Sequence, residues 1–112
     1  MIEIAILNHL NANASFPTFM EVPEGGGDAP FAVLQKTGGG EENRIFSATL
    51  TVQSYGRTLL EAAETNEEVK AIMAAAAELP EIGRVSLNSD YNYTDTAKKR
   101  YRYQAVFDII HY

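Results

Sequence analysis

The chain contains 112 residues, of which 15 are acidic and 9 are Lys or Arg, so its formal net charge is −6. Hydrophobic residues make up 46% of it, which favours one folded domain over residues 1–112 rather than a disordered chain. Cysteine is absent, which excludes disulfides, cysteine-ligated metal sites and a cysteine nucleophile and is typical of a reducing compartment. Because the sequence has no apolar run of about 20 residues and no basic leader, we expect neither membrane insertion nor export.

A helix and a short edge strand are predicted at the N-terminus. Ile2, Ile6 and Leu10 recur every four residues, which is the spacing of one face of a helix, and Pro17 limits its extent. Residues 18–22 are suited to a strand and lie between two prolines. Since proline cannot donate to a β-ladder, this segment predicts a strand at the edge of a sheet.

Two glycine-rich segments flank the next predicted strand, residues 31–36. Segments 24–30 and 37–43 each contain three consecutive glycines with acidic neighbours, which predicts mobile connections. Neither segment is a phosphate loop, because neither has a following Lys-Ser/Thr pair or a G-x-G-x-x-G pattern that opens a helix. We assign them, as a hypothesis, to protein contacts made by Gly25, Gly26, Gly27, Gly38, Gly39, Gly40, Glu41 and Glu42.

A strand and a long helix follow. Apolar and polar residues alternate strictly from 46 to 53, which predicts a strand. Residues 56–79 have helical spacing and end at Pro80. Two capping-box patterns, which begin at Thr58 and Thr65, are compatible with one helix or with a turn followed by a helix from Thr65. The single helix is favoured because no helix breaker separates the two patterns.

The last third of the chain predicts a β-hairpin built from residues 85–93 and 101–109, which both alternate. The register that matches the most aromatic residues pairs Tyr93 with Tyr101, Tyr91 with Tyr103, Leu87 with Phe107 and Val85 with Ile109. It places all four tyrosine rings on one face and the arginines at positions 100 and 102 on the other.

These elements predict an α+β fold, with a single mostly antiparallel sheet of four to five strands and two helices packed on one face. The uncovered face would carry Ser, Thr, Asn and Gln side chains, which suit either solvent or a hydrated protein contact.

Groups that could support catalysis or metal binding are few. His9 lies beside the apolar face of the first helix and His111 lies next to the C-terminus, so a paired acid–base role is not expected. Residues 90–95 contain four oxygen-bearing side chains, but the Gly and Glu positions of an EF-hand loop hold Asp95 and Tyr101. We therefore expect a protein that is not an enzyme and that holds no metal or cofactor.

The one basic cluster lies at the predicted hairpin tip and consists of Lys98, Lys99, Arg100 and Arg102. Interleaved tyrosines suggest a nucleic-acid surface, but the predicted alternation separates the rings from the arginines. The simplest interpretation is a charged hairpin tip, and the functional alternative is a contact with an acidic neighbour. In a homo-oligomer, Glu41 and Glu42 of the adjacent copy would provide it.

Several stretches together resemble small minor structural proteins of long-tailed bacteriophages and prophages, of the type called tail terminator, tail completion or head-tail joining protein. The resemblance covers the first helix and the chain from about residue 30 onward, and it rests on segments 37–40, 48–55, 61–69, 87–95 and 101–108.

The resemblance implies a hexameric ring at the head-proximal end of the tail tube, which stops tube polymerisation and offers a surface for head attachment. The implied partners are further copies, the tail-tube protein and a head-tail connector protein. DNA would pass through without specific binding, and the protein would belong to the virion after assembly in the host cytoplasm. We place the ring contact between the edge strand 18–22, or the C-terminal strand, and loops of the next copy. The alternatives are a head-completion or connector protein and a tail-assembly helper.

Overall fold

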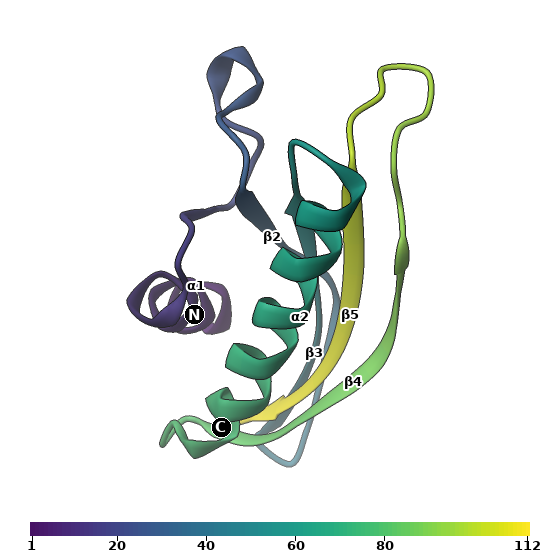
Figure 1. Cartoon of the computed structure of the whole chain (residues 1–112). Helices are drawn as coiled ribbons and strands as arrows, with labels where there is room; N and C mark the ends of the chain where they lie inside the picture. Colours follow the sequence, from purple (N-terminus) through teal and green to yellow (C-terminus); the bar gives the residue numbers. More distant parts are fainter.

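A curved five-stranded sheet wraps around helix α2, and helix α1 lies against α2 on the same side of the sheet (Figure 1). The computed structural model describes residues 1–112. In chain order its elements are α1 (Ile2–Asn13), β1 (Thr18–Phe19), η1 (Glu24–Gly26), β2 (Phe31–Glu42), β3 (Ile45–Tyr55), α2 (Leu59–Ala75), η2 (Ala76–Glu78), β4 (Ile82–Asn92) and β5 (Arg102–His111). The strand order is β1-β2-β3-β5-β4, and only the β1–β2 pair is parallel. The predicted α+β fold is confirmed.

The core fills the space between the two helices and one face of the sheet. The residues that predicted the first helix, Ile2, Ile6 and Leu10, are all buried in it. Alternate residues of β3 and β5 supply the sheet side, namely Ala48, Leu50, Val52, Ala105, Phe107 and Ile109. The other face of the sheet has no helical layer (Figure 1), and its buried apolar residues form a small separate cluster of Phe31, Val33 and Tyr55.

Helix α2 is the single helix that the sequence favoured. Its N-cap is Thr58, whose hydroxyl accepts a hydrogen bond from the backbone N–H of Glu61 at 3.1 Å. The second capping-box residue, Thr65, is buried inside the helix and caps nothing. The chain therefore forms one helix that begins after Thr58, and not a turn followed by a helix from Thr65.

The prediction of a mobile connection over residues 37–43 is wrong. Gly38, Gly39 and Gly40 lie in β2 and pair with β3, after a bulge that follows Lys36. The turn between β2 and β3 contains only Asn43 and Arg44, whose φ angles are 53° and 64°. Positive φ at both central residues is the requirement of a type I′ two-residue hairpin turn, so the ladder continues through the glycines up to that turn.

The predicted tyrosine register is half right. Leu87 pairs with Phe107 and Val85 with Ile109, as predicted. A bulge after Leu87 then shifts β4 by one residue, so that Tyr91 pairs with Gln104 rather than with a tyrosine. Because side chains alternate between faces, a shift of one residue moves Tyr91 and every later β4 residue to the opposite side.

Strand β1 is a sheet edge, as predicted, but it contains only Thr18 and Phe19, which pair with Ala32 and Val33. The C-terminal strand β5 lies between β3 and β4 and has no free edge. Both edges of β5 are therefore paired within the chain, and β4 is the outer strand on that side.

Candidate protein-contact site

The predicted contact residues fall at two opposite ends of the sheet. At one end, here called the loop end, the segment 20–30, the β3–α2 connection and the β4–β5 hairpin project together (Figure 1). It holds Gly25, Gly26, Gly27, Lys98, Lys99, Arg100 and Arg102. At the other end, here called the acidic hairpin, Glu41 and Glu42 are the last residues of β2 before the β2–β3 turn, and Gly38, Gly39 and Gly40 precede them in the same strand. The molecule is 45 Å along its longest axis, and β2 and β3 run between the two ends.

A cavity of about 550 Å³ opens at the loop end. Its lining comes from three separate segments and comprises Gly27, Asp28, Ala29, Phe31, Tyr55, Gly56, Arg57, Lys99, Arg100 and Tyr101. The rings of Phe31 and Tyr55 stack in it, with centroids 4.6 Å apart and planes inclined by 10°. The cavity thus combines stacked aromatic rings with cationic side chains.

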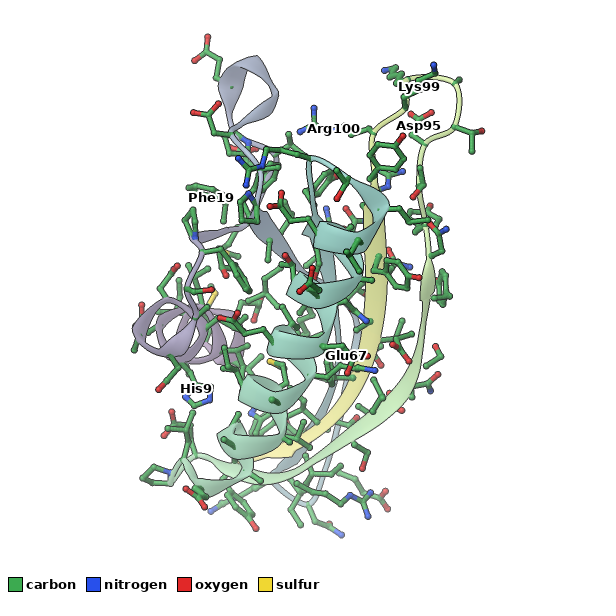
Figure 2. The ribbon with its side chains drawn as sticks, in the orientation of Figure 1. His9, Phe19, Glu67, Asp95, Lys99 and Arg100 are labelled. Atoms are coloured by element: carbon green, nitrogen blue, oxygen red, sulfur yellow. The ribbon has the colours of Figure 1, made fainter.

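Arg100 ties the two projecting segments of the loop end together. Figure 2 shows Arg100 reaching back from the hairpin, whereas Lys99 lies out at its tip. The Arg100 guanidinium donates to the carbonyl oxygen of Gly26 and lies 4.9 Å from the ring centroid of Tyr55. An arginine held over an aromatic face gains cation–π stabilisation and loses little conformational freedom in a later contact.

Arg102 extends this arrangement across the open face of the sheet. Its Nε donates to the Tyr93 carbonyl oxygen at 2.7 Å, and its Nη1 donates to the Tyr55 hydroxyl at 3.2 Å. The guanidinium also lies 4.6 Å from the centroid of the Tyr93 ring, which meets Tyr91 edge to face. The expected separation of arginines from tyrosine rings is therefore wrong for Tyr91 and Tyr93, because the one-residue shift in β4 brings these two rings to the face of Arg102. Tyr103 alternates with Arg102 along β5 and keeps the opposite face, as predicted.

Lys98 and Lys99 form no ion pair and no side-chain hydrogen bond, and both are exposed. The tip that carries them is shaped by Asp95, whose carboxylate accepts from the backbone N–H groups of Ala97 and Lys98. The structure thus divides the basic cluster into two internally bound arginines and two free lysines.

The acidic hairpin has a hollow of its own, of about 450 Å³. Glu41 and Glu42 line it and form no ion pair. Beside them lie Phe46 and Ile45, and Ile45 is 46% exposed. Carboxylates next to exposed apolar side chains form a surface that suits a protein partner.

Arg57, on the rim of the loop-end cavity, forms a two-point contact with Glu61. Its Nε and Nη2 lie 3.0 and 2.7 Å from the two carboxylate oxygens. The side-chain hydrogen bond from Arg57 lowers the pKa of Glu61 to about 2, with a further contribution from the Arg57 backbone N–H. This pair fixes the rim where the chain enters α2.

The depressed pKa of Glu61 predicts a pH dependence. A carboxyl group whose pKa falls on folding contributes stability above its unfolded pKa, near 4.5, and loses that contribution as the pH falls towards about 2. We expect a carboxyl titration by NMR with a midpoint near 2 in the wild type and near 4.5 in Arg57→Met. Glu61→Gln should also flatten the loss of stability over this pH range. A midpoint that is unchanged in Arg57→Met would contradict the assignment.

The two histidines and Asp90, which the sequence analysis considered for catalysis or metal binding, lie outside the loop-end cavity and contact other residues of the chain. His9 bonds to the Ile72 carbonyl oxygen at 2.8 Å, whereas His111 stacks on Phe46 at 5.3 Å. Asp90 accepts from Asn66 and pairs with Lys70, and the hydrogen bond from Lys70 lowers its pKa. No group of three or more His, Asp or Glu side chains is arranged to hold a metal ion.

Sequence reasoning missed the stacked rings of the cavity, Phe31 and Tyr55, and its rim residue Arg57. The sequence did contain an indication of these rings. Tyr55 lies on the same side of its strand as the polar residues Thr51 and Gln53, because residues two apart share one face. Aromatic residues on this side indicate a second apolar cluster on the open face.

No protein-family model matches the chain, and comparison with the curated proteins gives no significant match. Neither helix is long and apolar enough to cross a membrane.

Proposed function

We propose that the chain is a structural subunit of a long-tailed bacteriophage that forms a ring on the tail tube, stops tube polymerisation and offers a surface to the head. The proposal takes the kind of assembly from the sequence resemblance. What carries it in this molecule is the loop end, where residues from three segments form a surface of arginine and tyrosine around the cavity.

Arginine and tyrosine are among the side chains enriched where proteins bind each other tightly, because each covers a large area and still forms hydrogen bonds. Arg100 and Arg102 are already held in position by Gly26, Tyr55 and Tyr93, so less freedom is lost on binding. A surface of this kind supports a contact function.

A closed ring also needs a heterologous contact, in which two different patches of the same chain meet. The loop end and the acidic hairpin are two such patches, and the strands β2 and β3 hold them apart. An acidic chain suits a ring through which DNA passes, because its charge of −6 repels phosphate.

Sedimentation with assembled tail tubes tests this function. We expect the chain to co-sediment with tubes and to appear at one end of each tube by gold labelling. A connector protein would remain with the heads, and an assembly helper would be absent from finished tails. Either of those distributions would contradict the terminator role and favour the corresponding alternative.

A further inference from the structure

The two ends of the sheet carry opposite charges that have no ion-pair partner within the chain. Lys98 and Lys99 at the loop end, and Glu41 and Glu42 at the acidic hairpin, are all exposed and form no ion pair within the chain. This contrasts with Arg57 and Lys70, which both have carboxylate partners.

These opposite charges do not meet within one copy. Arg102 pairs with Tyr55 at the loop end of β3, whereas Glu42 pairs with Ile45 at the opposite end of the same strand. About ten residues of extended strand, at roughly 3.3 Å each, separate them. Only a second copy of the chain can bring the two ends together.

We propose that the loop end of one copy receives the acidic hairpin of the next, with Lys98 and Lys99 against Glu41 and Glu42. The contact is heterologous, so its repetition generates a ring or a filament according to the angle between successive copies. It rests on the proposed function, for which it supplies the contact between subunits.

The shape and chemistry of both ends fit this contact. The loop-end cavity presents Lys99 and the exposed rim to the incoming turn, while Asp28 on its wall offers a carboxylate to Arg44 at the tip of that turn. At the acidic hairpin, Ile45 is 46% exposed and provides apolar area beside the charges. Charge complementarity of this kind sets orientation and register more than raw affinity.

Charge reversal in two variants tests the contact. K98E/K99E makes both ends of the copy acidic, and E41K/E42K makes both ends basic. We expect each variant alone to associate at least about tenfold more weakly than the wild type in sedimentation equilibrium, because attraction becomes repulsion at every contact. An equimolar mixture should associate again, since alternating copies restore opposite charges at each contact. The fourfold variant K98E/K99E/E41K/E42K should also associate.

Matched variants separate a specific contact from an effect of net charge. E64K/E78K reverses two exposed carboxylates of α2 and η2 and changes the net charge as much as E41K/E42K does. It should associate like the wild type. K98A/K99A provides a milder change that removes the charges without reversing them, and thermal melting checks that every variant is folded.

Three results would overturn the contact: a wild-type chain that stays monomeric at about 1 mM, charge-reversed variants that associate like the wild type, or a mixture that fails to restore association. These results are separable from a failure of the proposed function. If the mixture associates but the chain does not bind tail tubes, the contact stands and the phage role falls. If the chain caps tubes but the mixture does not associate, only the contact falls.

Discussion

Gly56→Ala is expected to lower the stability of the chain by about 3 kcal/mol, towards the upper end of the cost of overpacking. Gly56 follows β3 and begins the connection to α2, and its N–H donates to the Tyr101 carbonyl oxygen at 3.1 Å. A Cβ at this position would lie 2.3 Å from the backbone N and 2.8 Å from the Cα of Ala62. Because the clash is with backbone, relief requires α2 to move off the sheet.

Thermal melting measures this effect. A loss of about 3 kcal/mol corresponds to a fall in Tm of roughly 12–24 °C for a domain of this size. Gly38→Ala is the matched control, since its Cβ would meet Thr49 at an ordinary 3.6 Å. Its stability should stay within about 0.5 kcal/mol of the wild type. Equal melting temperatures for the two variants would contradict the close approach of β3 and α2.

Tyr55→Ala is the second large effect, with an expected loss of about 3 kcal/mol. Tyr55 is 2% exposed although it lies on the face without helices. Its ring stacks on Phe31 and lies under Arg100 and Arg102, so its removal opens a cavity and frees both arginines. Chemical denaturation should therefore show a lower midpoint, and amide hydrogen exchange should show weaker protection at the loop end.

Two further substitutions identify which part of the Tyr55 side chain stabilises the fold. Tyr55→Phe removes only the hydroxyl, which bonds to Gln53 and Arg102, and should cost about 1 kcal/mol. Tyr103→Ala removes a half-buried ring outside the open-face cluster and should also cost about 1 kcal/mol. If Tyr103→Ala were as costly as Tyr55→Ala, the register without the β4 bulge would be supported instead.

The elements with regular periodicity could be predicted from the sequence. Spacing of four in the first helix and spacing of two from residue 46 onward place Ile6 and Leu50 in the core correctly. The pairing of Leu87 with Phe107 also follows, because a slip by one residue would have turned the apolar residues of β4, Val85 and Leu87, to the opposite face.

The errors arose where pairing between distant segments overrides local preference. Glycine is weak in strands, yet Gly38 to Gly40 extend β2 because β3 supplies a full set of partners. The bulge after Leu87 has no marker in its own sequence, and it alone decides which face Tyr91 and Tyr93 occupy. The candidate site depends on this bulge, which is why its residue types were identified but its arrangement of arginines and rings was not.

Tail length measured by electron microscopy tests the central claim most directly. Tails are assembled from purified tube protein with and without this chain, and their lengths are compared. With the chain present, we predict tails of uniform length that bear a ring at one end; without it, we predict tubes of irregular and excessive length. Identical length distributions in the two preparations would contradict the account.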